Sequence, residues 1–171
     1  NTIEYGFDFS AFFNISDNWF VYFVTSFYNS EDKAMFNNES IKTNTWSNYS
    51  VLSNDLSLLK DESLTVNFTL IYNGKNQLGF QINDTRIHTD LSIKKSIFKK
   101  KGNLSLHFAD LLNKQDEEIT SKYLDQYNSR HVNLDNRYIK LGFSYKFGNT
   151  ILKTNERIKD RQERDRLKER Q

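Results

Sequence analysis

Apolar and polar residues alternate with a period of two along most of the chain. The alternation is clearest in segments 3–13, 64–72 and 139–147, where every second residue is apolar and those between are mostly polar. Successive side chains of a β-strand point to opposite faces, so this pattern predicts strands with one apolar and one polar face. Seven strands are expected, at residues 2–14, 18–30, 44–59, 63–74, 78–98, 102–113 and 136–148. No helical pattern interrupts them, which favours antiparallel hairpins.

The connections between these strands alternate in length. Short connections are expected at 16–18, 60–62 and 99–102, a connection of middle length at 73–76, and long ones at 31–43 and 114–135. In an up-and-down meander, odd-numbered connections lie at one end of the sheet and even-numbered ones at the other. One end would then carry tight turns and the other long polar loops, as in outer-membrane barrels.

Strand length and aromatic placement favour a membrane over a soluble core. Several predicted strands have 12 or more residues, enough for a tilted bilayer crossing of about 9–11 residues. Aromatic residues lie near strand ends, where rings with a polar atom suit the membrane interface. The expected interface aromatics are Trp19, Phe20, Tyr28, Tyr72 and Tyr138. A soluble sandwich or jelly-roll would also show the alternation and remains the alternative.

Composition agrees with a two-faced sheet. The chain is only 37% hydrophobic and its mean hydropathy is −0.74, but that average combines an apolar face, a wet face and polar loops. Aromatic residues make up 15% of the 171 residues, too many for a disordered chain. The absence of cysteine excludes disulfides, thiolate metal sites and a cysteine nucleophile.

The last residues differ from the rest in charge. Segment 153–171 holds eight basic and five acidic side chains, with opposite charges at helical spacing. This predicts a short, charged, solvated helix or tail at 150–171. The interleaved acids argue against a nucleic-acid-binding arm, so no nucleic acid partner is expected.

Candidate chemistry is sparse. His88, His107 and His131 are widely separated, without Asp, Glu or His at metal-ligand spacing, and are expected to be polar lumen or loop residues. Glu4 and Asp8 share a face, a pairing that could serve acid–base catalysis, but solvated carboxylates facing a lumen are the simpler interpretation. No catalytic constellation is found, so we expect neither an enzyme nor a cofactor.

Two stretches resemble a known family. Residues 102–114 resemble the penultimate strand of TonB-dependent receptors, where an Asn/Asp-Leu-Phe-Asn/Asp segment ends the strand before the last large loop. The matching residues are Asp110, Leu111, Leu112 and Asn113, with Leu112 where Phe is common. Residues 137–149 resemble the closing strand. The charged extension is similar to that of the Bacteroidota family of TonB-dependent-receptor-like outer-membrane barrels.

The resemblance implies a receptor of about 22 strands around a plug, importing a small, unidentified ligand with TonB-type energy coupling. Residues 1–149 would be the C-terminal portion of its wall, within outer-membrane lipid and against the rest of the barrel and plug. Residues 150–171 would form a periplasmic tail, and the long loops would be extracellular. The closing strand would face lipid and be recognised by the barrel assembly machinery through Ile139, Leu141, Phe143, Tyr145 and Phe147. The alternative function is a soluble all-β binding or adhesion module.

Overall fold

The computed structural model describes residues 1–36, 39–123 and 125–147, and their regular structure is entirely β-strand. The predicted tail at 150–171 lies outside the described residues. The strands are β1 (Thr2–Ser16), β2 (Trp19–Phe36), β3 (Glu39–Leu58), β4 (Leu64–Asn73), β5 (Asn76–Leu78), β6 (Gln81–Asn83), β7 (Arg86–Ile97), β8 (Gly102–Phe108), β9 (Glu117–Tyr123), β10 (Gln126–Val132) and β11 (Ile139–Tyr145).

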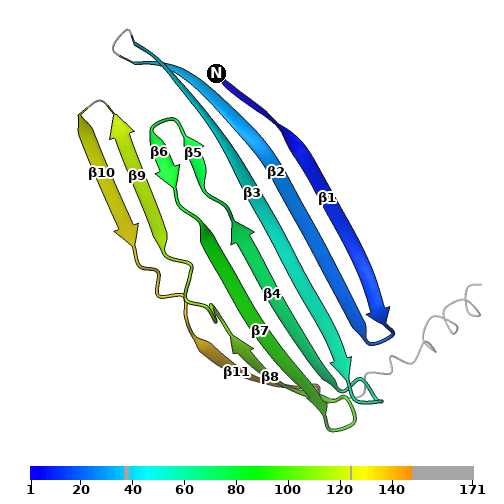
Figure 1. Cartoon of the computed structure of the whole chain (residues 1–171). Coiled ribbons are helices and arrows are strands. Elements are labelled where there is room, and N and C mark those ends of the chain that lie inside the picture. Colours follow the sequence, from blue (N-terminus) through cyan, green and yellow to red (C-terminus); the bar gives the residue numbers. More distant parts are fainter. Residues whose placement is uncertain (37–38, 124, 148–171) are drawn as a thin grey trace, which may run out of the picture.

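Seven long strands form one antiparallel meander, which confirms the predicted all-β fold. Their order in the sheet is β1-β2-β3-β4-β7-β8-β11, so each strand pairs with the neighbours expected from its place in the chain. The turns β1–β2, β3–β4 and β7–β8 lie together at the lower end in Figure 1, here called the turn end. The opposite end, where β2–β3, β5–β6 and β9–β10 turn, is the hairpin end.

The hairpin end contains more strand than expected. The prediction of a long loop at 31–43 is wrong, because β2 and β3 stay paired from Trp19↔Leu56 to Phe36↔Glu39. The predicted loop at 114–135 instead holds the β9–β10 pair. The single strand predicted at 78–98 is broken into β6 and β7.

These additional strands form a second sheet in the order β10-β9-β6-β5. Figure 1 shows each of them continuing a strand of the long sheet toward the hairpin end: β5 follows β4, β6 precedes β7, β9 follows β8 and β10 precedes β11. The second sheet therefore extends the same wall.

Strand register brings the alternating apolar series of the long strands to one face, while β2 and β3 carry apolar residues on both faces. One row of paired residues runs across the sheet through Phe13, Val21, Asn54, Phe68, Leu91, Phe108 and Ile139. The row passes through β1 at Phe13, close to the turn end of that strand. It passes through β11 at Ile139, which is the first residue of that strand and lies at its opposite end. The apolar band therefore crosses the rows obliquely, as in barrels whose strands tilt and stagger.

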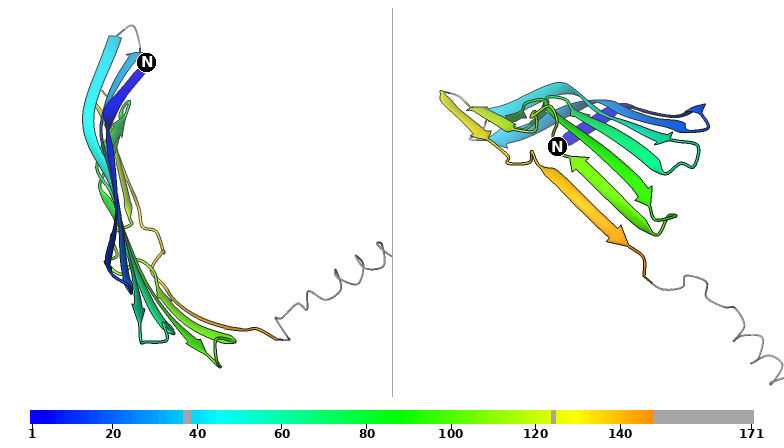
Figure 2. Two further views of the ribbon diagram at one scale, coloured as in Figure 1. Left: turned by 90° about the vertical axis from the view of Figure 1, so that its right-hand side faces the viewer. Right: turned by 90° about the horizontal axis from the view of Figure 1, so that it is seen from below.

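The sheet is a single curved layer without a core of its own (Figure 2). Among the described residues, Ala109 is the one buried hydrophobic side chain, while Phe7 is 62% and Phe143 63% exposed. A soluble sandwich would bury this face against a second layer. The arrangement does not support that alternative, because the apolar face has no protein covering within the described residues.

Candidate functional site

The sheet presents two surfaces, of which the apolar face is described first. Along β4 it presents Leu64, Val66, Phe68, Leu70 and Tyr72, while Thr65, Asn67 and Thr69 point to the opposite, polar face. β4 has 10 residues, which matches the 9–11 residues of a tilted strand crossing a bilayer. The apolar face has the chemistry and height of a lipid-contacting surface.

Polar side chains mark both ends of the apolar face. Toward the hairpin end, Glu31 forms ion pairs of 3.0 Å with Lys33 and 3.1 Å with Lys42. Hydrogen bonds from Lys33 and then Lys42 lower the pKa of the Glu31 carboxyl. Near the turn end, the Lys95 Nζ donates a 2.7 Å hydrogen bond to the Ser63 hydroxyl. Charged side chains therefore lie at both ends of the apolar face, and the uncharged part of that face lies between them.

The predicted interface aromatics divide between the two faces. Trp19 lies opposite Leu56 and Tyr72 opposite Ile87 on the apolar face, so a lipid-interface role stays a prediction for both. Phe20 and Tyr28 lie on the polar face, opposite Asp55 and Ser47, and Tyr138 packs on the His107 ring with 5.9 Å between centroids. Nearness to a strand end does not determine which face a side chain takes, so these three lie on the opposite face from Trp19 and Tyr72, and their interface role also stays a prediction.

The closing strand β11 presents its apolar residues as expected. Ile139, Leu141, Phe143 and Tyr145 lie on the apolar face, opposite β8. Phe147 follows the strand, is 86% exposed and contacts the Tyr145 ring edge-on at 4.8 Å. Recognition of this strand by an assembly machinery stays a prediction.

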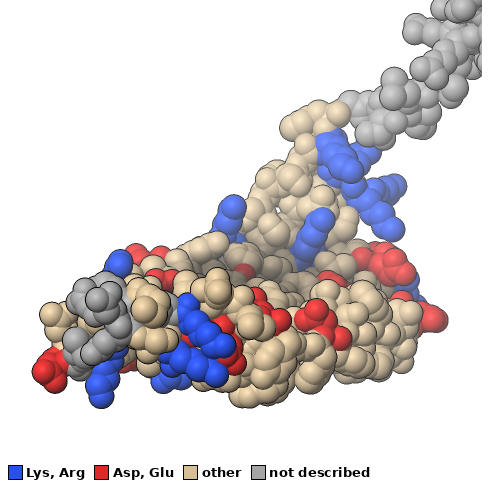
Figure 3. Space-filling model, turned by 90° about the horizontal axis from the view of Figure 1, so that it is seen from above, with Lys and Arg blue, Asp and Glu red and all other residues tan. Residues whose placement is uncertain are grey.

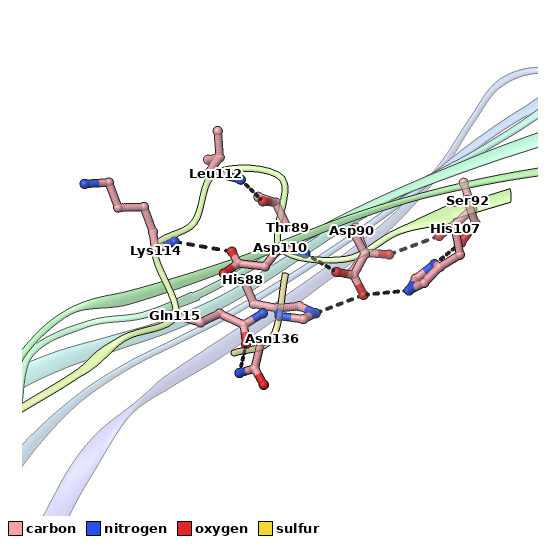
Figure 4. Close-up of polar contacts among 12 residues, drawn as sticks. His88, Thr89, Asp90, Ser92, His107, Asp110, Leu112, Lys114, Gln115 and Asn136 are labelled. Atoms are coloured by element: carbon pink, nitrogen blue, oxygen red, sulfur yellow. Dashed lines mark hydrogen bonds and ion pairs between the residues drawn. The ribbon is translucent and has the colours of Figure 1, made fainter. Parts of the chain in front are cut away.

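Two histidines that the sequence analysis treated as separate polar residues, His88 and His107, meet at Asp90 on the polar face (Figure 4). The Asp90 Oδ2 lies 3.0 Å from His88 Nε2 and 3.8 Å from His107 Nε2, and the Ser92 hydroxyl lies 2.8 Å from His107 Nδ1. His88, Asp90 and Ser92 share a face of β7, and β8 brings His107 opposite Ser92. Within the described residues, no group of three His, Cys, Asp or Glu is arranged to hold a metal ion.

The motif that resembled the penultimate strand forms a turn after β8, in which Asp110 is buried and Leu112 is exposed. Asp110 and Asn113 adopt positive φ values of 48° and 52°, a conformation that Asp and Asn tolerate better than most residues. The Asp110 backbone N–H donates to Asp90 Oδ1 at 3.1 Å, and its carboxylate accepts from the Lys114 N–H at 3.3 Å. This turn ends β8 and redirects the chain toward β9.

Thr89 anchors the same turn from β7. It is 1% exposed; its carbonyl accepts from the Leu111 N–H at 2.9 Å and its hydroxyl from the Leu112 N–H at 3.0 Å (Figure 4). The residues resembling a family motif thus have a structural role in tying β7, β8 and the start of β9 together.

Replacing Thr89 with valine is expected to loosen this turn. Valine keeps the shape of the buried Thr89 but leaves the Leu112 N–H without its acceptor, which should lower the free energy of unfolding by about 1–2 kcal/mol. Denaturant titration of the folded protein and hydrogen exchange of residues 109–116 measure the effect. Thr69→Val is the control at a half-buried threonine on the polar face, with an expected loss below about 0.5 kcal/mol. Equal losses in the two variants would contradict the assigned role of Thr89.

Ion pairs connect the strands of the hairpin end. Lys75 and Asp84 pair at 3.0 Å, and Arg86 binds Glu117. From this end, basic and acidic side chains are interspersed (Figure 3). The charges there link neighbouring strands to one another.

Asp32 ties the β5–β6 turn to the long sheet. Its carboxylate accepts from the Thr2 hydroxyl at 2.5 Å and from the Gly79 N–H at 3.1 Å. These hydrogen bonds, that of Thr2 first, lower the pKa of Asp32. Thr45 adds a nearby 3.1 Å hydrogen bond to the Gln77 side chain. Asp32 thus holds β1, β2 and the β5–β6 turn in one arrangement.

Acid should release the β5–β6 turn. Because the folded state lowers the pKa of Asp32, its stabilisation is complete above the ordinary value near 4 and is lost as pH falls through the lowered value. Hydrogen-exchange protection of the Gly79 amide, corrected for intrinsic rates, should therefore decrease below about pH 4. In Asp32→Asn the protection should be lower at neutral pH and nearly independent of pH over this range. A pH response that persists unchanged in Asp32→Asn would exclude this anchor.

Comparison with known proteins identifies the family. A model of the outer membrane protein beta-barrel family matches residues 1–145. Searches of curated proteins and of solved structures found no match. Among the described residues, no helix has the length and apolarity needed to cross a membrane. Since the family match covers most of the 171 residues, the chain belongs to the outer membrane protein beta-barrel family and is an outer-membrane protein.

Proposed function

We propose that this chain forms part of the wall of a larger outer-membrane receptor that imports a scarce nutrient with energy delivered through TonB to a plug. The seven-stranded sheet would be one sector of the barrel. Its apolar face would contact lipid, and its polar face would line the water-filled interior beside the plug.

The two open edges of the sheet carry this proposal. Among the described residues, β1 pairs only with β2 and β11 only with β8. A sheet edge in hydrocarbon would leave N–H and C=O groups without partners, at several kcal/mol each. With the apolar face turned outward, these edges would lie in lipid, and strands outside the described residues would complete the barrel.

The shape of the hairpin end supports a receptor. The paired extensions of β2 and β3 and the second sheet rise beyond the apolar band. Tall hairpins at one end and tight turns at the other are typical of barrels with extracellular loops and periplasmic turns. We assign the hairpin end to the cell exterior. β11 runs from the hairpin end to the turn end (Figure 1), so on this assignment the described chain would end on the periplasmic side.

Energy-dependent uptake tests the proposal. Cells producing the whole protein are compared with cells lacking TonB and with cells whose proton-motive force has been collapsed. We expect the protein in the outer-membrane fraction in all three cases and ligand accumulation only in the first. Accumulation that is independent of TonB and of the proton-motive force would point to passive diffusion and contradict energy-coupled import.

A further inference from the structure

Three rows of side chains form a grid on the polar face near the hairpin end. Paired residues across β1, β2 and β3 are Glu4–Ser30–Thr45 in the first row, Gly6–Tyr28–Ser47 in the second and Asp8–Ser26–Tyr49 in the third. The middle row begins with a glycine, so β1 presents no side chain between its two carboxylates. Glu4 and Asp8 therefore flank an opening, with their Cα atoms about 13 Å apart.

A hollow occupies this opening. Its volume is about 450 Å³, and the polar-face side chains that line it are those of Glu4, Asp8, Ser26, Tyr28 and Tyr49. Gly6 forms its floor: a Cβ there would lie 2.7 Å from the Tyr28 Cβ. A second hollow of about 210 Å³ adjoins it and shares Glu4 and Tyr28. The second hollow reaches β5 at Gln77 and Leu78.

The two hollows are acidic. Within the described part of the chain, their linings contain two carboxylates and no Lys, Arg or His. Glu4 accepts one hydrogen bond of 3.3 Å from the Ser30 hydroxyl. The basic residues of the polar face, such as Lys94 and Lys140, lie on β7 and β11. An anionic ligand would be repelled by this part of the wall, whereas a cation would gain Coulomb energy from both carboxylates.

Two tyrosines add a second kind of attraction for a cation. Tyr28 and Tyr49 stand on neighbouring strands in adjacent rows and both line the first hollow. The face of an aromatic ring attracts ammonium and guanidinium groups, and their apolar stems pack on the same ring. The tyrosine and serine hydroxyls can accept the remaining hydrogen bonds of such a ligand.

The geometry points to the Glu4–Asp8 hollow as a binding site for organic cations that carry primary ammonium or guanidinium groups, such as a polyamine or a basic peptide. One cationic group binds each carboxylate, and the stem between them lies over Gly6 against Tyr28. This inference rests on the proposed function in one respect: it names the class of ligand that the receptor would import. Binding itself requires no energy coupling.

Equilibrium binding to the whole protein in detergent tests the site directly. Spermidine and trilysine serve as the cationic probes, maltotriose as the neutral probe and tricarballylate as the anionic one. The site variant is Glu4→Gln combined with Asp8→Asn, which keeps side-chain shape and removes both charges. The matched control is Asp55→Asn, on the same face but outside both hollows. Tyr49→Leu removes one ring.

We expect both cationic probes to bind and the other two not to. The double variant should bind about tenfold more weakly, and Tyr49→Leu several-fold more weakly, whereas Asp55→Asn should stay within about twofold of the parent. Raising salt from about 50 mM to about 500 mM should weaken binding to the parent and have less effect on the double variant. Spermidine binding without trilysine binding would restrict the ligand to polyamines, and the reverse would restrict it to peptides.

Three results would overturn the inference: no binding of either cation, cation binding unchanged in the double variant, or maltotriose binding that depends on the same residues. Because binding is measured without energy, its failure is distinguishable from failure of the uptake experiment. Cation binding without TonB-dependent import would support the binding site and contradict the proposed transport. TonB-dependent import of another ligand without cation binding would support the proposed transport and contradict the binding site.

Discussion

Replacing Phe68 with arginine is expected to prevent stable insertion of this wall. Phe68 lies in the middle of β4 on the apolar face, between Asn54 of β3 and Leu91 of β7. An arginine at the bilayer midplane of a barrel costs about 2–4 kcal/mol, a large part of the stability of most proteins. The expected result is a much lower denaturation midpoint in lipid vesicles and less folded protein in the outer membrane.

The neighbouring residue provides the control for this substitution. Thr69 follows Phe68 on β4 and points to the polar face, where its hydroxyl donates to the Asn67 side chain at 3.2 Å. Thr69→Arg adds the same charge one residue away, but into water, and should cost below about 1 kcal/mol. Equal losses for the two arginines would mean that the faces of β4 do not differ in their environment, contrary to our assignment.

A single methyl group at Gly6 should separate two strands. An added Cβ would lie 2.3 Å from the Phe27 carbonyl oxygen and 2.7 Å from the Tyr28 Cα, and both contacts are with backbone atoms. Backbone in a paired strand cannot move aside without breaking ladder hydrogen bonds. We therefore expect Gly6→Ala to lower the free energy of unfolding by about 3 kcal/mol, measured by denaturant titration, and to expose amides of β1 to exchange.

Gly142 is the matched control for Gly6. It also lies on the polar face, opposite Ser105, and an added Cβ would come within 2.5 Å of the Ser105 Oγ. That atom ends a side chain that can rotate, at the expense of a weak 3.4 Å hydrogen bond to the Gly142 carbonyl. Gly142→Ala should cost about 1 kcal/mol or less. A larger loss at Gly142 than at Gly6 would contradict the close β1–β2 approach.

Alternation was sufficient to predict the strands within the apolar band. In β1, β4 and β11 every second residue is apolar over the full length, so one register satisfies the pattern and a slip of one residue would reverse the faces. In segment 44–59 apolar residues occur at both odd and even positions, so alternation alone does not determine which face is apolar. Pairing with β2 and β4 resolves it, with Trp46 on the apolar face and Tyr49 and Val51 on the polar one.

The hairpin end could not be predicted in the same way. Beyond the apolar face the strands carry no alternating apolar series, so their sequences resemble loops. Lys33 and Lys42 lie opposite one another in the β2–β3 ladder and both pair with Glu31, an arrangement that single-sequence patterns do not indicate. The β9–β10 hairpin is similarly polar, at Ser121, Asn128 and their neighbours.

Contacts between strands likewise lie beyond what the sequence shows. The alternation predicts that His88 and Asp90 share a face, but His107 joins them only through the β7–β8 register. Glu4 and Asp8 were correctly assigned to one face. Their position beside Tyr28 and Tyr49 depends on how β1, β2 and β3 pair. The hollow forms because Gly6, a glycine, has no side chain to fill it.

Spin labels along β4 measure the central claim most directly, that one face of this wall contacts lipid and the other water. The 171 residues contain no cysteine, so single cysteines at positions 64–73 can be labelled one at a time in the whole protein, with any other cysteines replaced. We predict that oxygen, which concentrates in lipid, reaches labels at even positions such as 66, 68 and 70, and that a water-soluble nickel chelate reaches those at 65, 67 and 69. Even positions closed to both reagents, as in a packed protein core, would contradict the account.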